Sequence, residues 1–325
     1  MQMKKKLAVV MGGYSSERQI SLKSGKMVYE ALKDGLYDAF LVDIGPDSWN
    51  VLIEDDTYPI EKEDFSFRRK GKKIQFDMVF NAIHGHPGED GIFTAYLDLI
   101  GIPYSCSRSS EMMLTFDKRS CNAVLAKYGI RVPPSIAVNK GELIDPDRID
   151  HELGFPCFVK PARSGSSFGV SRVERPVDLE VAQEHAFSED STILIERAIE
   201  GSEMAVGVYR VGSITKVLAI TEIRTTNAFF DYEAKYEGKN EEITPAQIPE
   251  SVESEIRETA IKVFDLLGLR GFARADFIIE ENKPYLIEIN TVPGLSRESI
   301  LPQQVRYNGM SPREFYELVI QEVCK

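Results

Sequence analysis

The sequence predicts an α/β domain with a doubly wound, parallel sheet, followed by a larger region of mixed α+β structure. The first reason is that apolar strand-like runs alternate with helix-like segments over about the first 105 residues, as in a parallel sheet covered by helices. The second is that most segments predicted beyond the first domain are short strands. The chain has 325 residues, of which 43% are hydrophobic and 28% charged, which suffices for two or three globular domains.

The N-terminal elements follow one another at short intervals. Residues 7–11 form a continuous apolar run that ends at Gly12 and Gly13, as expected of a buried parallel strand that closes in a tight turn. A helix is expected over 21–33, where leucine, valine and alanine recur at near-helical spacing. The unit is completed by a predicted strand at 39–44, a strand at 77–82 and a helix at 91–100. Residues 45–75 are charged and irregular, so we expect a hairpin or a surface excursion there.

The rest of the chain opens with a predicted helix over 118–128, which Gly129 and the prolines after it stop. The strands that follow are predicted at 135–138, 157–160, 169–173, 192–196, 204–211, 216–222, 274–279 and 285–288. Further helices are expected at 177–187, 253–267 and 312–324. Residues 224–247 are polar and aromatic without a clear period, and a loop of that length in a compact protein is usually functional or disordered.

A hairpin near the C-terminus carries the most informative polar side chains. Asp276 precedes one apolar run, Glu288 and Asn290 end the next, and turn-forming residues lie between them. A hairpin of that length sets Asp276 opposite Glu288, and alternation along the strand places Glu288 and Asn290 on one face. Two carboxylates and an amide oxygen suit Mg²⁺, which also takes substrate phosphates into its shell. The alternative is an acidic hairpin on a solvated face.

A loop rich in serine and glycine, residues 161–169, follows Lys160 at the end of a predicted strand. Small residues let backbone N–H groups approach phosphate oxygens, and serine hydroxyls add donors. No Walker A motif and no Gly-x-Gly-x-x-Gly pattern occurs, which excludes the usual P-loop and dinucleotide-binding folds. By itself, such a loop is better explained as a plain flexible hairpin.

Charge and cysteine content restrict the partners. The formal net charge of −12 argues against nucleic acid, because a phosphate backbone needs basic patches. The four cysteines include no Cys-x-x-Cys pair, as in a reduced, cytosolic protein. No apolar run reaches the roughly 18 residues of a membrane span, and no signal peptide precedes the first strand. We therefore expect a cytoplasmic protein with no nucleic-acid or membrane partner.

The order of these features resembles the ATP-grasp superfamily, in which two α+β lobes hold ATP between antiparallel sheets. The resemblance runs from Lys118 through the Lys160 loop, Glu196 and Glu203 to the C-terminal hairpin. More specific strings resemble the D-alanine–D-alanine ligase family nearly from end to end. They are Gly12-Gly13-Tyr14-Ser15-Ser16-Glu17-Arg18, His84-Gly85-His86-Pro87-Gly88-Glu89-Asp90-Gly91, Phe230-Asp231-Tyr232-Glu233-Ala234-Lys235-Tyr236 and Asn290-Thr291-Val292-Pro293-Gly294-Leu295.

The resemblance implies ATP-driven joining of two D-alanines, through an acyl phosphate, for peptidoglycan precursor synthesis. It implies an N-terminal doubly wound, pre-ATP-grasp substrate domain over 1–105, a central ATP-grasp lobe over 106–198 and a C-terminal lobe over 199–325. The expected cofactors are ATP, as co-substrate, and two Mg²⁺ or Mn²⁺ ions. The expected partners are D-alanine and a second copy of the chain, in a homodimer through the first domain.

The resemblance also implies a role for each site residue. The metal ions would be held by Asp276, Glu288 and Asn290. The nucleotide would contact Lys118, Lys160, Ser166 and Ser167 at its phosphates, Glu196, Arg197 and Ile199 at the adenine, Glu203 at the ribose and Lys235 at the γ-phosphate. The first D-alanine would contact Glu17 and His84, and the second would contact Ser299 and Ile300. A hydrogen-bonded set would be formed by Glu17, Ser166 and Tyr236. Arg274 and the Gly294 N–H would stabilise developing charge. Considered alone, Glu17 is better explained as a charge in a first helical turn.

Two other functions fit parts of this pattern. A different ATP-grasp carboxylate–amine ligase would lack the combination of Glu17, His84 and the Tyr236 loop. A nucleotide-binding protein without catalysis would lack a metal ligand or Arg274, and the chain has all of them. The pair at 297–298, Arg-Glu, stands where family members more often have small or polar residues, which affects the shape of the second substrate pocket.

Overall fold

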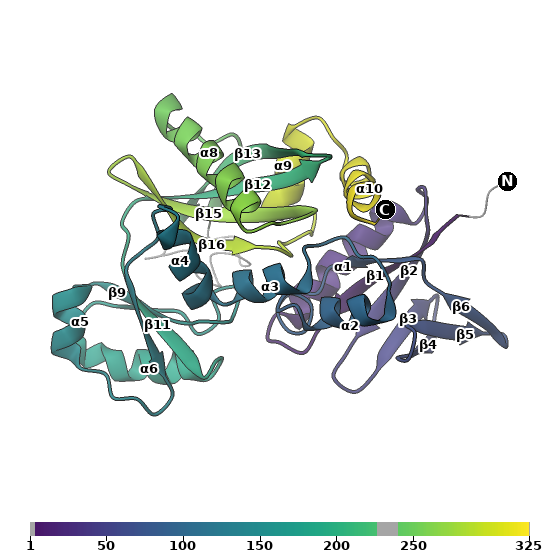
Figure 1. Ribbon diagram of the computed structural model, residues 1–325, viewed down its shortest axis with the longest axis horizontal. Helices are drawn as coiled ribbons and strands as arrows, with labels where there is room; N and C mark the ends of the chain where they lie inside the picture. The colour runs from purple at the N-terminus through teal and green to yellow at the C-terminus, as the bar shows by residue number, and fades with distance from the viewer. Residues whose placement is uncertain (1–3, 226–239, 325) are drawn as a thin grey trace.

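The computed structural model describes residues 4–225 and 240–324, and these form three β-sheets (Figure 1). The first sheet belongs to the N-terminal part of the chain and has the strand order β6-β5-β4-β3-β2-β1-β7. Its strands are β1 (Lys6–Gly12), β2 (Asp38–Ile44), β3 (Trp49–Ile53), β4 (Asp56–Glu61), β5 (Ser66–Arg69), β6 (Lys72–Gln75) and β7 (Met78–Asn81). Strand β1 runs parallel to β2 and β7, and the remaining neighbours pair antiparallel.

Strand β1 is buried on both faces. The odd-numbered residues of its apolar run pack with helix α1 (Arg18–Leu32), whereas Ala8 and Val10 pack with helix α2 (Ile92–Ile100). Because successive side chains point to opposite faces, a strand between two helices must be apolar throughout. The predicted helices on both faces are therefore confirmed around the three parallel strands.

Residues 45–75 were expected to form a hairpin or a surface excursion; the surface excursion is wrong, and the antiparallel pairing of a hairpin is present and extends over the four strands β3 to β6. Phe65 and Phe67 are fully buried and join Val51, Ile60 and α2 in one core. The strands have only four to six residues, and charged residues stand among the apolar ones in three of them. So short a pattern is hard to recognise in sequence, although it suffices once the neighbouring strand is in place.

The second sheet is antiparallel and has the order β10-β9-β11-β8. Its strands are β8 (Ser135–Asn139), β9 (Cys157–Pro161), β10 (Ser171–Val173) and β11 (Thr192–Arg197). Helices α5 (Pro146–Glu152) and α6 (Leu179–Phe187) cover the face that carries Val159, Ile193 and Ile195. The alternate residues, among them Phe158 and Glu196, line a pocket on the opposite face.

The third sheet is also antiparallel and has the order β14-β13-β12-β15-β16. Its strands are β12 (Ser202–Val211), β13 (Ile214–Thr225), β14 (Asn240–Ile243), β15 (Phe272–Glu280) and β16 (Lys283–Asn290). Helix α8 (Glu250–Leu266) packs on one face, and α9 (Ile300–Tyr307) and α10 (Pro312–Val323) pack on the other. The predicted loop over 224–247 is thus corrected at both ends, where β13 and β14 lie, and residues 226–239 fall outside the described part of the chain.

Short helices were missed by the sequence analysis. They are α3 (Ser109–Phe116), α5 and α9, each of eight residues or fewer, while α4 (Lys118–Lys127) was predicted. Two turns contain too few apolar positions to establish a helical period. In the part of the chain that the structure covers, every helix is too short or too polar to cross a membrane.

The C-terminal helix returns to the N-terminal sheet. Phe315, Tyr316 and Ile320 of α10 share a core with residues of β1, β7 and α1, and Figure 1 shows α10 beside α1. The side chain of Glu317 accepts a hydrogen bond of 2.8 Å from the Leu36 N–H. The first and third sheets therefore share one hydrophobic core, which fixes their positions relative to each other.

Candidate functional site

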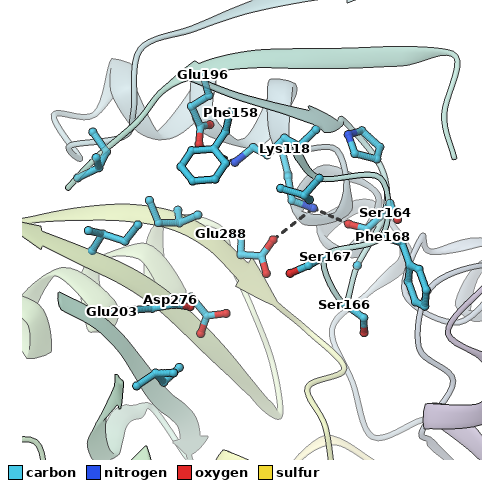
Figure 2. A pocket seen from close by; sticks show the side chains of 18 of the residues that line it. Lys118, Phe158, Ser164, Ser166, Ser167, Phe168, Glu196, Glu203, Asp276 and Glu288 are labelled. Carbon is cyan, nitrogen blue, oxygen red and sulfur yellow. Dashed lines mark hydrogen bonds and ion pairs between the residues drawn. The ribbon is translucent and has the colours of Figure 1, made fainter. Parts of the chain in front are cut away.

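A pocket lies between the second and third sheets (Figure 2), and we call it the inter-sheet pocket. It is lined by Lys118, Lys160, Ser166, Ser167, Glu196, Arg197, Ile199, Glu203, Arg274, Asp276 and Glu288, all of which the sequence analysis had singled out, together with Phe158 and Phe168. The sheets contribute alternate residues of β9, β11 and β15. The loop of residues 161–169, rich in serine and glycine, closes one end of the pocket, and we call it the serine loop. Residues from four separate stretches of the chain thus meet in one cavity.

The hairpin of β15 and β16 brings the three proposed metal ligands together. Asp276 lies opposite Glu288 in the strand register, as predicted. The Asn290 side-chain amide donates to Asp276 Oδ2 at 2.9 Å and to Glu288 Oε1 at 3.3 Å. Arg274 donates to both oxygens of Asp276, at 2.8 and 2.7 Å. The carboxylates are therefore held in a fixed arrangement before any ligand enters.

The chemistry of this donor set fits a hard divalent cation. Asp276 and Glu288 supply carboxylate oxygens to the lining of the inter-sheet pocket, and such oxygens are what Mg²⁺ and Mn²⁺ prefer. Asn290 turns its NH₂ group to the two carboxylates, so its oxygen would reach a cation only after rotation of the amide. A bound cation would also replace the charge that Arg274 now supplies to Asp276.

Lys118 joins the hairpin to the serine loop. Its Nζ lies 3.2 Å from Glu288 Oε2 and donates to the Ser164 carbonyl oxygen at 2.6 Å (Figure 2). Burial alone would lower the pKa of Lys118, but the charges of Glu288, Glu89 and Glu17 outweigh it and raise the pKa. Lys118 is therefore a cation that can neutralise a phosphate.

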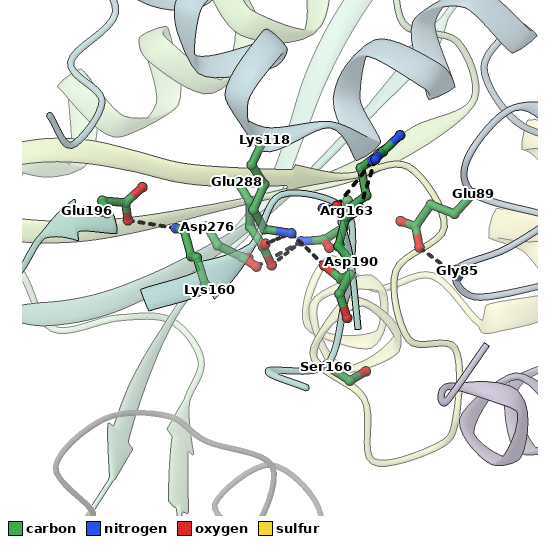
Figure 3. A network of polar contacts seen from close by, with 12 residues as sticks. Gly85, Glu89, Lys118, Lys160, Arg163, Ser166, Asp190, Glu196, Asp276 and Glu288 are labelled. Atoms are coloured by element: carbon green, nitrogen blue, oxygen red, sulfur yellow. Dashed lines mark hydrogen bonds and ion pairs between the residues drawn. The ribbon is translucent and has the colours of Figure 1, made fainter. Parts of the chain in front are cut away.

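Lys160 and Glu196 form a buried ion pair in the inter-sheet pocket, with Lys160 Nζ 2.6 Å from Glu196 Oε1 (Figure 3). Burial raises the pKa of Glu196, and the Lys160 charge opposes that shift. The second oxygen of Glu196, Oε2, is buried and has no hydrogen-bond partner among the described residues. A buried oxygen without a donor is costly, so this atom marks a position where a ligand N–H would be stabilised.

The serine loop reaches the start of α1. Ser166 and Ser167 both have left-handed backbone angles, with φ of 51° and 61°. Ser166 Oγ donates to Glu17 Oε1 at 2.7 Å. A side chain on Gly165 would collide with the same carboxylate, because its Cβ would lie 2.6 Å from Glu17 Oε1. The predicted contact between Ser166 and Glu17 is present, whereas Tyr236 and Lys235 lie outside the described residues.

A second pocket, which we call the adjoining pocket, opens from the same hairpin toward the N-terminal sheet. It is lined by Glu17, His84, Ser166, Arg274, Glu288, Asn290, Gly294, Ser299 and Ile300, all predicted, and by Lys23, Lys26, Glu89, Arg297 and Glu298. Ser166, Arg274 and Glu288 line both pockets. These three residues form the boundary where a group in one pocket can react with a group in the other.

His84 is buried and neutral. Burial lowers its pKa to about 4, and its Nε2 lies 2.9 Å from Ser24 Oγ. The same Ser24 oxygen accepts from the Leu295 N–H at 3.2 Å. Ser24 thus connects His84 to the segment that carries Gly294, and the sequence analysis missed it. A signal was available, because serine occupies the apolar face of α1 at Ser21 and Ser24.

Glu89 is a second missed residue. Its carboxylate accepts from the Gly85 N–H at 3.2 Å (Figure 3) and from the Val292 N–H at 3.3 Å. Burial, reinforced by the charge of Glu17, raises its pKa to about 8. The carboxylate connects the His84 loop to the end of β16, so it fixes two walls of the adjoining pocket. Its string, 84–91, was recognised, but the spacing alone gave it no role.

The far wall of the adjoining pocket is the N-terminus of α9. Ser299 is the N-cap residue, its side chain caps no helix N–H, and its Oγ lies 2.8 Å from Ser296 Oγ. A Cβ on Gly294 would lie 2.8 Å from Ser299 Oγ, so glycine keeps this corner open. Uncapped N–H groups at a helix N-terminus favour an anion such as a carboxylate.

An α/β domain followed by two antiparallel sheets that close on a polar pocket is the architecture of an ATP-grasp enzyme. A family model described as D-ala D-ala ligase N-terminus matches residues 6–107, and one described as D-ala D-ala ligase C-terminus matches residues 124–321. The chain belongs to the D-alanine–D-alanine ligase family.

Individual relatives agree with this assignment over nearly their full length. The D-alanine–D-alanine ligase of Flavobacterium johnsoniae is 46% identical over 318 residues, which cover 98% of each chain. The structure of the VanG D-Ala:D-Ser ligase from Enterococcus faecalis superposes with a TM-score of 0.86 at 28% identity, covering 98% of this chain and 99% of that one. The D-alanine–D-alanine ligase from Bacillus anthracis complexed with ATP superposes with a TM-score of 0.78 at 28% identity, covering 98% and 97%.

Proposed function

We propose that this protein joins two D-alanine molecules into D-alanyl-D-alanine and converts ATP to ADP and phosphate. The observation that carries the proposal is the wall of Ser166, Arg274 and Glu288 shared by the two pockets. A nucleotide in the inter-sheet pocket and an amino acid in the adjoining pocket would meet at this wall. Family membership supports the same reaction.

The reaction has two steps. A carboxylate oxygen of the first D-alanine attacks the γ-phosphorus of ATP and ADP leaves, which gives an acyl phosphate. The amine of the second D-alanine, after losing a proton, attacks the acyl carbon and phosphate leaves. Glu17 and His84 would hold the first D-alanine, with the anionic Glu17 facing its ammonium group and neutral His84 adding a polar contact. Water must be excluded while the acyl phosphate exists, and the buried walls of the adjoining pocket suit this need.

The inter-sheet pocket would hold the nucleotide. Lys118, Lys160 and the Ser166–Ser167 turn face the phosphates, and the unpartnered Glu196 oxygen would accept from the adenine amino group. Backbone groups at Arg197 and Ile199 would contact the ring, Glu203 the ribose and Lys235 the γ-phosphate. Two Mg²⁺ or Mn²⁺ ions held by Asp276, Glu288 and Asn290 would supply charge neutralisation of the phosphates.

Developing charge in the second step would be met by fixed donors. Arg274 is held by two hydrogen bonds to Asp276, so its guanidinium is already oriented. The Gly294 N–H would donate to the tetrahedral oxyanion, and Tyr236 would join the Glu17–Ser166 contact. The carboxylate of the second D-alanine would bind at Ser299 and Ile300, the N-terminus of α9. Such preorganised donors are the largest catalytic contribution in many enzymes.

A different second substrate is the alternative. The name of the VanG structure specifies D-serine, and this chain carries Arg297 and Glu298 on the wall of the second subsite. Lys235 and Tyr236 are intact, which favours D-alanine. We further propose cytoplasmic action in cell-wall precursor synthesis, a homodimer through the first domain, and unit boundaries at residues 105 and 198.

The test is substrate-dependent phosphate release. Purified protein with ATP and Mg²⁺ should release phosphate when D-alanine is added and should not do so with L-alanine. Product analysis with mixed D-alanine, D-serine and D-lactate then identifies the second substrate. Phosphate release that ignores D-alanine would rule out the proposed reaction.

A further inference from the structure

Gln304 is the one amide side chain that is fully buried behind the adjoining pocket, among the residues the structure describes. It lies on α9, one helical turn beyond Ile300, so the two side chains share a face of the helix. Nothing in the assigned roles uses this residue. A leucine would fill the same space without the cost of burying an amide, so its presence calls for a physical reason.

The amide of Gln304 uses both of its ends. Its Oε1 accepts from the Gly207 N–H at 2.9 Å, and its Nε2 donates to the Ala205 carbonyl oxygen at 2.9 Å and to Thr221 Oγ1 at 3.0 Å. Thr221 Oγ1 in turn lies 2.6 Å from Thr244 Oγ1. One side chain is therefore bonded to β12 and β13 at the same time.

These hydrogen bonds are formed at an irregularity in the pairing of β12 with β13. The register between β12 and β13 shifts between Val206 and Val208, which leaves Gly207 outside the ladder on that side. Gly207 still pairs with Arg274 on the other side. A Cβ on Gly207 would lie 2.5 Å from Gln304 Oε1, so glycine is needed for the amide to approach. Gln304 thus occupies a β-bulge directly beside the strand position of Arg274.

The arrangement fixes where α9 begins. A shift of α9 by one residue, about 1.5 Å along its axis, would break all three bonds and leave buried polar groups unsatisfied. Ile300 adds a separate apolar contact, because it packs with Ala205 and Ile223. The start of α9 is therefore held at a set distance from Arg274.

We infer that Gln304 is a positioning residue for the second amino-acid substrate, because it fixes the α9 N-terminus relative to Arg274. This inference rests on the proposed function, in which the carboxylate of that substrate binds at Ser299 and Ile300. Gln304 does not touch the substrate. Its effect is transmitted through the register of α9, whose first N–H groups receive the carboxylate while Arg274 faces the reacting phosphate.

The test uses three variants at the contact of Gln304 with β12 and β13, which we call the joint. Gln304→Leu removes all three bonds. Thr221→Val removes one of them, together with the contact to Thr244, and keeps the shape of the side chain. Gly207→Ala displaces the amide from the strand side. Ser107→Ala is the control, since Ser107 is equally buried, exchanges two hydrogen bonds with Arg270 and lines neither pocket. Initial rates over a wide D-alanine range, at saturating ATP, give one Michaelis constant for each D-alanine site, and rates over a range of ATP at saturating D-alanine give the Michaelis constant for ATP. Thermal melting reports folding.

We expect Gln304→Leu to raise the Michaelis constant of the second D-alanine site about tenfold, as the loss of a buried hydrogen-bond network would. The constants of the first D-alanine and of ATP should stay within about twofold of wild type. Thr221→Val should show a smaller shift of the same kind, and it decides the question if Gln304→Leu does not fold. Ser107→Ala should lower the melting temperature without this selective change.

Two results would overturn the inference. One is that the joint variants change all three constants alike, and the other is that they lower only the melting temperature, as the control does. Either would leave the proposed function standing, because wild-type activity with D-alanine is measured in the same series. A wild-type protein that fails to release phosphate with D-alanine would instead refute the proposed function itself.

Discussion

Asp276 illustrates how one buried side chain serves two partners. It accepts a bidentate pair of hydrogen bonds from Arg274 and a third bond from Asn290. In the proposed reaction it would also face a divalent cation, so its negative charge is needed twice. A neutral side chain of the same shape would keep the packing and lose that charge, which makes the residue a sharp probe.

We expect Asp276→Asn to lower kcat by about a hundredfold or more, because charge stabilisation in the transition state is lost. The melting temperature should change by only a few degrees, since the side chain keeps its volume. Phosphate release and thermal melting on the same preparation measure the two effects. Glu281→Gln, in the exposed turn of the same hairpin, is the matched control. An Asp276→Asn protein with near-normal kcat would contradict the role.

Glu89 makes stability depend on pH. Its folded pKa of about 8, raised by burial and by Glu17, lies above the value of about 4.3 in an unfolded chain. The folded state therefore binds more protons than the unfolded state between these values, and this contribution to stability is lost as pH rises through them. Above about pH 8 it stays constant.

Replacing Glu89 by Gln should remove this pH dependence. Between about pH 5 and about pH 9, the melting temperature of wild type should fall relative to that of Glu89→Gln as pH rises. The reason is that only the wild type has a carboxyl to ionise in the buried site. A melting-temperature difference that is the same at every pH would show that Glu89 does not titrate there.

Among the elements, the connection from β11 to β12 joins the two sheets of the inter-sheet pocket. Arg197 at the end of β11 forms two hydrogen bonds to Glu280, at 3.1 and 2.9 Å, and the Glu200 N–H donates to the same carboxylate. Gly201 passes so close to β15 that a Cβ would lie 1.8 Å from the Ile279 carbonyl oxygen. The short connection therefore sets the spacing between the sheets.

The same substitution at two glycines tests this close approach. Gly201→Asn should destabilise the protein by about 3 kcal/mol or more, because backbone atoms must move to admit the Cβ. Gly212→Asn should be nearly neutral, since Gly212 has φ of 61°, which asparagine tolerates, and open space around it. Denaturant unfolding measures both. Equal effects would show that the spacing at Gly201 is not constrained.

The sequence predicted most of the strands outside residues 45–75 and missed three short helices. The run at the start of the chain and the hairpin of Asp276 and Glu288 were recognised, because their apolar residues alone define a strand. The strands β3 to β6 were expected only as a hairpin or a surface excursion, and the helices α3, α5 and α9 were missed. Each is too short to show a period, and each becomes stable only when a neighbouring element covers its apolar side.

On the scale of the whole molecule, the second sheet is connected to the rest differently from the third. The third sheet shares a core with the N-terminal sheet, whereas the second sheet has a hydrophobic core of its own with α5 and α6. Polar contacts link it to the N-terminal loop, among them Ser166 to Glu17 and Ser16 to Glu189 at 3.2 Å. A ligand between the second and third sheets would therefore add contacts to both.

We expect ATP and Mg²⁺ together to raise the melting temperature by several degrees in the absence of D-alanine. A ligand at a hundredfold excess over its Kd adds about 2.7 kcal/mol to the free energy of unfolding. Mg²⁺ alone should do little, and ATP with a chelator should do less than the combination, because the carboxylates of the hairpin repel bare phosphates. Asp276→Asn should lose the Mg²⁺-dependent part. An increase that needs no metal would argue against the hairpin as a metal site.

The sequence alone determined the class of fold and the order of the main elements, which depend on residue type and spacing along the chain, and its resemblance to the ligase family indicated most of the residues of both pockets. Every predicted site residue within the described part of the chain lines one of the two pockets. Only the tertiary structure decided what connects segments far apart in the chain. The roles of Ser24, Glu89 and Gln304 follow from hydrogen bonds to backbone groups 97 to 271 residues away along the chain, which no local pattern can specify.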